Sequence, residues 1–301
     1  MSQLRLENYS SFINLMKEYK PSTLFLNRKE EIVDRLLLDL DQESGDMDYK
    51  KIPRDYITKR NILRGSLNQR DTKPLDEHFL KRLDSLLQTE LEENGITEIN
   101  SLKSVSEEFP ENNLDQSNKL VLWHGDITLL NADAIVNAAN KQMLGCFLPL
   151  HKCIDNAIHS AAGPQLREDC NTIMSLQGEP EQTGLAKITR AYNLPSRFVL
   201  HTVGPIVPKG TTLTELQKKQ LKNSYISCLE LANKIDVIKS IAFCAISTGV
   251  FGFPKDEAAY IAISTVNEWL SNHNNHFEKI VFNVFTEADK NEYINAIKTL
   301  H

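Results

Sequence analysis

Hydrophobic residues in the first part of the chain recur at the three- and four-residue spacing of amphipathic helices. Prolines and polar segments separate three stripes of this kind. We therefore expect an all-helical region over residues 1–115. The polar segment 107–118, which contains Pro110, is the predicted linker to the rest of the chain. The stripes consist of Phe12, Leu15 and Met16, of Ile32, Leu36 and Leu37, and of Leu80, Leu83, Leu86, Leu87 and Leu91.

The pattern changes after this segment, where short apolar and β-branched runs alternate with longer amphipathic stretches. This alternation predicts an α/β fold over residues 118–301, with a mostly parallel central sheet between two layers of helices. Ligands of such sheets bind in loops at the carboxyl ends of the strands. The expected strands are Leu120–Trp123, Ala134–Ala138, Ala186–Ala191, Phe198–Val203, Ile241–Ile246 and Ile280–Phe285, and the expected helices lie at 152–175, 213–234, 255–272 and 287–299.

The composition is that of a globular chain, with 301 residues of which 41% are hydrophobic and 25% are charged. Residues 1–117 hold 17 Lys+Arg against 23 Asp+Glu, and residues 118–301 hold 17 against 17. Neither part has the positive charge that binding a nucleic-acid polymer requires, and no apolar run is long enough for a membrane span. Five cysteines, an odd number, favour reduced thiols or metal ligands. We therefore expect a cytoplasmic protein, and we take it to be a monomer.

Three loops that follow expected strands carry residues suited to a nucleotide ligand. Asp126 can accept a hydrogen bond from an exocyclic amine such as that of adenine, or it can form a helix cap or Asx turn. Asn140 can donate and accept at once, which suits a ribose diol, or it can serve as a turn residue. Successive N–H groups in the third loop either surround a phosphate or belong to an ordinary loop. The residues of that third loop are Ser247, Thr248, Gly249, Val250 and Phe251.

Residue types that bind metals gather in the loop before the first expected helix of the α/β region. Cys146, His151 and Cys153 fall within eight residues, and one residue separates His151 from Cys153, so both point the same way in an extended loop. Two thiolates with an imidazole select zinc, and three protein ligands leave the open position of a catalytic site. The alternatives are buried thiols beside a surface histidine, or a structural ion with a distant fourth ligand.

The other cysteines and two histidines are expected to be structural. His124 and His201 end or lie within apolar strands, where histidines with satisfied hydrogen bonds are more common than catalytic bases. Phe285, at the end of the last strand, either stacks on a base or packs in the core. The cysteines with the apolar surroundings of core thiols are Cys170, Cys228 and Cys244.

Taken in order, the motifs of residues 118–301 resemble those of the macrodomain family, whose members bind ADP-ribose and in many cases hydrolyse it from proteins. The resemblance implies a three-layer α/β/α fold with a mixed, mostly parallel central sheet. It implies that Asp126 holds the adenine amine with Ile127 beside it, that residues 247–251 surround the pyrophosphate, and that Asn140 faces the distal ribose. Asp155 occupies the position of the catalytic aspartate. The matching motifs are GDIT (125–128), DAIVNAAN (133–140), IHSAAG (158–163), TGLAKITRAYNLP (183–195), VLHTVGP (199–205) and STGVFGFP (247–254).

The loop 145–155 departs from the usual family pattern, because only Gly145 remains of a run of glycines and the loop is longer. In this it resembles the zinc-dependent subclass, which also has an N-terminal helical extension like the segment 60–70. The resemblance implies a Zn²⁺-dependent protein-ADP-ribosyl hydrolase that cleaves the glycosyl bond to mono-ADP-ribosylated proteins, with ADP-ribose and these proteins as its partners. A non-catalytic ADP-ribose reader and an O-acetyl-ADP-ribose deacetylase are the alternatives. The role of the extension stays open.

Overall fold

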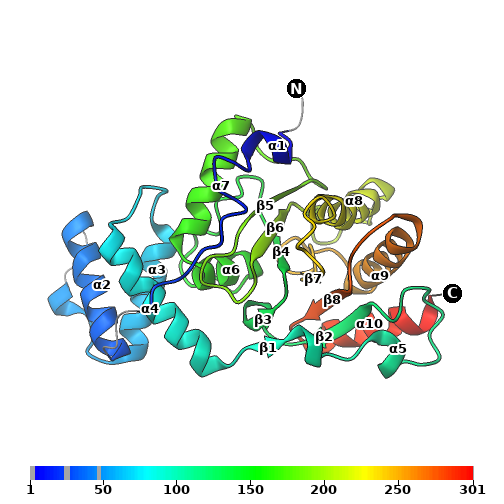
Figure 1. The fold of residues 1–301 in the computed structure, drawn as a ribbon, viewed down its shortest axis with the longest axis horizontal. Helices are drawn as coiled ribbons and strands as arrows, with labels where there is room; N and C mark the ends of the chain where they lie inside the picture. Colours follow the sequence, from blue (N-terminus) through cyan, green and yellow to red (C-terminus); the bar gives the residue numbers. More distant parts are fainter. Residues whose placement is uncertain (1–3, 24–27, 46–48, 301) are drawn as a thin grey trace.

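A computed structural model describes residues 4–23, 28–45 and 49–300 of the chain, and Figure 1 shows their arrangement. The central feature is a six-stranded sheet with the strand order β2-β8-β7-β4-β6-β5. Every neighbouring pair is parallel except β5 and β6, which are antiparallel. The expected mixed, mostly parallel sheet is therefore confirmed. The strands are β2 (Leu120–His124), β4 (Ala134–Ala138), β5 (Ala186–Arg190), β6 (Phe198–Thr202), β7 (Ser240–Phe243) and β8 (Lys279–Val284).

Helices cover both faces of this sheet, which gives the three layers of the predicted fold (Figure 1). One face carries α8 (Glu215–Ala232), α9 (Lys255–Asn272) and α10 (Glu287–Thr299), and the other carries α6 (Ile154–Ala162) and α7 (Pro164–Gln177). The expectation of a single helix over 152–175 is wrong. Gly163 has a φ of 97°, outside the helical region, and Pro164 starts the second helix.

The N-terminal part of the chain forms a separate group of helices that packs on the layer of α6 and α7 (Figure 1). Its main members are α2 (Lys29–Ser44), α3 (Tyr56–Gln69) and α4 (Glu77–Asn94), with the short helix η1 at Tyr49–Lys51. They share an apolar core of their own, which explains why the hydrophobic stripes were visible in the sequence. That core consists of Ile32, Val33, Leu36, Leu37, Leu40, Leu63, Phe79, Leu83, Leu86 and Leu87.

The first predicted stripe does not form a regular helix. Helix α1 covers only Leu6–Tyr9, and turns follow it, with Asn14 at a φ of 49° that interrupts any helical path. Phe12 and Met16 are 63% and 52% exposed as a result. Tyr9 is buried, and its hydroxyl accepts a hydrogen bond from the N–H of Ile188 on the edge strand β5 (3.0 Å).

The connection between the helices and the sheet is ordered. It contains β1 (Thr97–Glu98), η2 (Ile99–Ser101) and α5 (Val105–Glu108), and β1 pairs in parallel with β3 (Leu130–Asn131). The segment predicted as a linker packs against the α/β core through its buried Leu114.

A buried carboxylate joins the helical part to the sheet part. Asp84 on α4 is 3% exposed and accepts hydrogen bonds from the Tyr19 hydroxyl (2.6 Å), the Asn193 amide (2.8 Å) and the Gln165 amide (3.3 Å). These donors come from the N-terminal segment and from the α/β region. The two parts of the chain are therefore held by directional contacts as well as by apolar packing.

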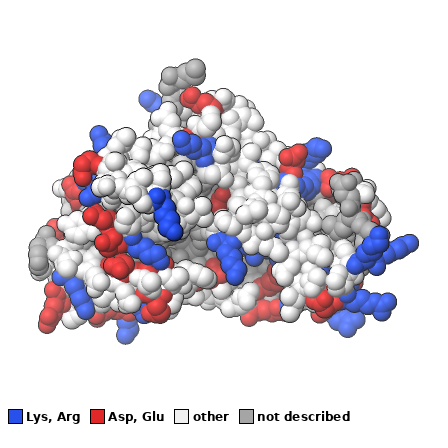
Figure 2. Space-filling model, turned by 180° about the vertical axis from the view of Figure 1, so that it is seen from behind, with Lys and Arg blue, Asp and Glu red and all other residues white. Residues whose placement is uncertain are grey.

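The surface carries charges of both signs. On the face shown in Figure 2, lysines and arginines are interspersed with aspartates and glutamates, without one continuous basic region. None of the helices in the described part of the chain is long and apolar enough to cross a membrane.

Candidate functional site

The candidate residues gather at one end of the sheet because they follow parallel strands. Asp126 comes just after β2, Asn140 just after β4, and Ser247 just after β7. Strands β2, β8, β7 and β4 are consecutive in the sheet and all parallel, so their carboxyl ends meet at one edge. This edge is where the ligands of open α/β sheets bind.

Asp126 caps a short helix through one carboxylate oxygen, and its other oxygen has no hydrogen-bond partner among the described residues. It is the N-cap of η3 (Ile127–Leu129), and its Oδ1 accepts from the N–H (2.9 Å) and the hydroxyl (2.7 Å) of Thr128. The carboxylate is exposed, whereas the Ile127 side chain is buried in the core. Phe285, beyond the end of the neighbouring strand β8, is 73% exposed, so the core alternative for this ring is wrong.

The loop after β7 has the backbone of an anion site. Ser247 has a φ of 66°, and its buried hydroxyl has no hydrogen-bond partner among the described residues. In that same part of the chain, no acceptor is found for the N–H groups of Gly249, Val250 or Phe251. A left-handed residue followed by unpaired N–H groups forms a concave site for phosphate. Thr248 is held by its hydroxyl, which donates to the carbonyl oxygen of Ala245 (3.0 Å).

The three expected metal ligands converge in the structure. The donor atoms of Cys146, His151 and Cys153 all lie within 4.8 Å of one another, and all three residues are half-buried. Cys146 Sγ is 3.5 Å from His151 Nδ1. Cys153 caps α6, where its sulfur accepts from the N–H of Asn156 (3.4 Å), and burial raises the pKa of this thiol to about 11. Two sulfurs and an imidazole in such proximity fit zinc by donor chemistry.

The one glycine left in this loop is required by its surroundings. Gly145 has a φ of 79°, and a β-carbon there would lie 2.8 Å from Cγ of the buried His159 ring. Any other residue would push the loop away from α6 or displace that ring.

Asp155 lies buried at the start of α6, next to the metal loop. Its Oδ1 accepts from the Asn137 amide (2.8 Å) and lies 3.6 Å from Nε2 of His159, and its Oδ2 is 3.4 Å from the Asn140 amide. Burial raises the pKa of this carboxyl to about 6, although the hydrogen bond from Asn137 opposes the shift. Asn140 also donates to the carbonyl oxygen of Gly145 (3.0 Å), so it ties the surroundings of Asp155 to the loop.

A chain of buried hydrogen bonds continues behind Asp155. The Asn137 amide also contacts Nδ1 of His201 (3.2 Å), whose Nε2 lies 2.9 Å from the hydroxyl of Thr189. Since the amide donates to both, His201 carries its proton on Nε2 and donates to Thr189. Both ring nitrogens of His201 are thus satisfied, as expected from the sequence. The expectation that the remaining cysteines are core thiols is also confirmed, because Cys170, Cys228 and Cys244 are buried.

Comparison with known proteins places this geometry in a family. A family model described as "Macro domain" matches residues 136–262. A "Protein-ADP-ribose hydrolase" of Treponema medium is 49% identical over 243 residues, which cover 81% of this chain and 89% of that protein. The chain belongs to the macro domain family. A "Protein-ADP-ribose hydrolase" of Staphylococcus aureus (strain MRSA252) is 40% identical over 264 residues, covering 88% of this chain and 94% of the relative.

Solved macrodomain structures share the fold. The Trypanosoma brucei macrodomain in complex with ADP-ribose superposes with a TM-score of 0.58 at 30% identity, over 75% of this chain and 92% of that one. The Oceanobacillus iheyensis macrodomain with ADP superposes with a TM-score of 0.54 at 40% identity, over 62% and 93% of the two chains.

The N-terminal extension borders a cavity beside Asp126, a position that the sequence did not reveal. This cavity of about 190 Å³ is lined by Asp126 and Thr128 and, from the extension, by Arg60, Arg64 and Glu90. Arg60 is held there by a bidentate ion pair with Glu90 (2.7 and 2.8 Å). The sequence motif at residues 60–70 pointed to this helix but not to its position beside Asp126.

Proposed function

We propose that this protein is a zinc-dependent protein-ADP-ribosyl hydrolase that removes mono-ADP-ribose from modified protein side chains. The observation that carries the proposal is the proximity of Asp155 and Asn140 to a cluster of two cysteines and one histidine at the carboxyl end of the sheet. The names of the relatives in Treponema medium and Staphylococcus aureus support the hydrolase assignment.

The nucleotide end of the substrate would be held largely by polar groups that have no hydrogen-bond partner within the described parts of the chain. The free oxygen of Asp126 would accept from the adenine amine, and the exposed ring of Phe285 would stack near it. The N–H groups of residues 249–251 and the hydroxyl of Ser247 would surround the pyrophosphate. This remote binding energy would hold the distal ribose at the reacting end of the cleft, near Asn140.

Cys146, His151 and Cys153 would hold the zinc ion. A bound zinc ion would supply Lewis acidity toward an oxygen of the ribose or its leaving group, or would lower the pKa of water. Two thiolates would balance the ion's two charges and make the site a weaker acid than one with three histidines. Positioning by the protein therefore matters more here.

The reacting end would depend on the placement of two side chains. Asp155 would orient a water molecule toward the C1″ carbon of the distal ribose, with its carboxylate fixed by Asn137. Asn140 would fix the ribose hydroxyls, so that water and C1″ approach within about 3–3.5 Å. The hydroxyl of the water would bond to C1″ as the C1″–O bond to the protein breaks, and the remaining proton of the water would go to the oxygen of the side chain that leaves. The product is free ADP-ribose.

The test is release of free ADP-ribose from a panel of peptides carrying ADP-ribose on serine, aspartate or glutamate. The full-length protein should release it, a zinc chelator should stop the release, and Cys146→Ala and Cys153→Ala should lose it while ADP-ribose binding partly survives. Metal analysis of the same preparations should give one zinc ion per chain. Retention of the modified peptides without release would make the protein a reader, and full activity of metal-free protein would exclude the zinc role.

A further inference from the structure

The loop that carries the metal ligands has little structure of its own. Residues 145–153 are the later part of the connection from β4 to α6 and have no regular secondary structure, and Leu148 and Leu150 at the tip of this loop are 59% and 43% exposed. Leu150, directly before His151, has a φ of 55°. This left-handed backbone costs a non-glycine residue about 1–2 kcal/mol, and it persists only where neighbouring groups hold it.

The group that holds Leu150 comes from the N-terminal extension. Asn68, on α3 and 3% exposed, accepts a hydrogen bond from the Leu150 N–H at its Oδ1 (3.2 Å). The same oxygen accepts from the amide of Asn156 (3.0 Å), and the Asn68 amide donates to the Ser160 hydroxyl (3.1 Å). Asn68 therefore links α3, α6 and the residue before a metal ligand at a single buried point.

Asn156 extends this contact to the first half of the loop. Its amide also lies 3.2 Å from the carbonyl oxygen of Leu148 and 3.5 Å from that of Cys146. Its side-chain oxygen, Oδ1, accepts from the guanidinium of Arg64 on α3 (2.7 Å). Two side chains of the extension, Arg64 and Asn68, thus set the position of Asn156, which borders both cysteines of the loop.

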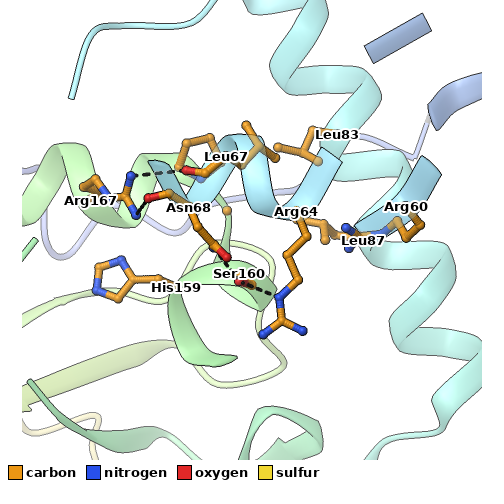
Figure 3. A pocket seen from close by; sticks show the side chains of 11 residues that line it. Arg60, Arg64, Leu67, Asn68, Leu83, Leu87, His159, Ser160 and Arg167 are labelled. Carbon is orange, nitrogen blue, oxygen red and sulfur yellow. Dashed lines mark hydrogen bonds between the residues drawn. The ribbon is translucent and has the colours of Figure 1, made fainter. Parts of the chain in front are cut away.

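Other contacts between α3 and the α/β region also hold this helix in place. Figure 3 shows Arg167 of α7 reaching the carbonyl oxygens of Leu67 and Asn68 at the end of α3, at 3.2 and 3.0 Å. A cation at a helix carboxyl end is favourable, so this contact fixes α3 along its axis. The cavity between α3, α4, α6 and α7 has a volume of only about 30 Å³. A β-carbon on Gly65 would lie 3.6 Å from Pro149 of the loop, so the helix and the loop are in close contact.

We infer that helix α3 of the extension helps to form the proposed metal site, and that Asn68 on this helix is the residue that positions the metal-binding loop. By holding Leu150 in its left-handed conformation, Asn68 keeps His151 beside Cys146 and Cys153 before any ion binds. Without it, part of the binding free energy of the metal goes into ordering the loop. This inference rests on the proposed zinc site, and it gives the extension a function that does not require contact with substrate.

The test compares three variants of the full-length protein. Asn68→Ala removes the acceptor for Leu150. Asn61→Ala changes an exposed asparagine on the same helix. Ser160→Ala removes a hydroxyl that contacts Asn68 and Asn156 but leaves the hydrogen bond from Leu150 to Asn68 in place. Zinc affinity, measured by competition with a chromogenic chelator, should fall about 10- to 100-fold in Asn68→Ala, which is the usual effect of losing a group that orients a metal ligand. It should stay near the wild-type value in the two controls, and ADP-ribose affinity should change less than about twofold in all three.

A second measurement on metal-free protein keeps the inference separate from the proposed function. Hydrogen exchange of a peptide covering residues 145–155 should be faster in Asn68→Ala and unchanged in Asn61→Ala and Ser160→Ala. If the wild type binds no zinc, the zinc dependence of the proposed function is wrong, but the exchange rates still test whether Asn68 orders the loop. Unchanged exchange in Asn68→Ala, or equal changes in Asn68→Ala and Ser160→Ala, overturns the inference.

Discussion

Replacing Asn137 by alanine should lower turnover without weakening nucleotide binding. Its amide donates to Asp155 at 2.8 Å, and a hydrogen bond to a charged group contributes about 1.5–3 kcal/mol. If that bond fixes the carboxylate during the reaction, its loss corresponds to a fall in kcat of about 10- to 150-fold. The affinity for ADP-ribose, measured by calorimetry, should stay within about twofold, because the proposed nucleotide contacts, at Asp126 and residues 247–251, lie elsewhere.

The matched control is Thr189→Val, at the far end of the same chain of hydrogen bonds. It removes the hydroxyl that pairs with His201 Nε2, which keeps a weaker contact with Cys170 Sγ (3.7 Å), and it leaves the contact between Asn137 and Asp155 intact. Both variants remove a buried hydrogen bond, so each should lower the free energy of unfolding by about 1–3 kcal/mol. Only Asn137→Ala should slow the release of ADP-ribose. Equal losses of kcat in the two variants, or a wild-type kcat in Asn137→Ala, would refute a positioning role for Asn137.

Three further outcomes depend on buried contacts. Gly204→Ala should raise the Kd for ADP-ribose about tenfold in calorimetry with zinc content unchanged, because a β-carbon there would lie 2.0 Å from Oγ of Ser247 and must displace that loop. Burial lowers the pKa of His201 to about 3 from its usual value near 6.5. Between these pH values the unfolded chain binds more protons than the folded chain, so the free energy of unfolding, measured in urea, should fall as the pH drops from 6.5 toward 3. The fall should be less steep in His201→Gln. Asp84→Ala should lower the free energy of unfolding by about 3 kcal/mol or more, since it leaves several buried donors unpaired. A smaller loss of this free energy in calorimetry would mean that water replaces the carboxylate.

The strands of the sheet were predictable because each is buried on both faces. A buried parallel strand is an almost uninterrupted apolar run, as in Ala134–Ala138, and such runs are visible in one sequence. The helices around the sheet followed from their amphipathic spacing, except that the break between α6 and α7 at Gly163 was missed. The pair β1 and β3 was missed, because two residues are too few to show any period. The stripe at Phe12 was misassigned because the left-handed turn at Asn14 is a backbone property that hydrophobic spacing does not report.

The candidate site was predictable where its residues are close in sequence or match a family motif. The cysteines and histidine of the metal loop lie within eight residues, so local spacing was enough to group them. Asn137 and Asn68 were missed for a different reason. Each looks like an ordinary polar residue in a strand or helix, and its importance depends on partners that the fold brings from distant positions. For Asn68 these partners lie 82 and 88 residues away, at Leu150 and Asn156.

The contact between Tyr9 and β5 also concerns the edge of the sheet while the chain is being synthesised. An unpaired row of N–H groups on an outer strand is a template for another chain. One of these groups, the N–H of Ile188, donates to the hydroxyl of Tyr9, which lies 179 residues earlier in the chain. Because the ribosome delivers the N-terminus first, Tyr9 is already available when β5 emerges. The protective segment thus precedes the surface that it covers.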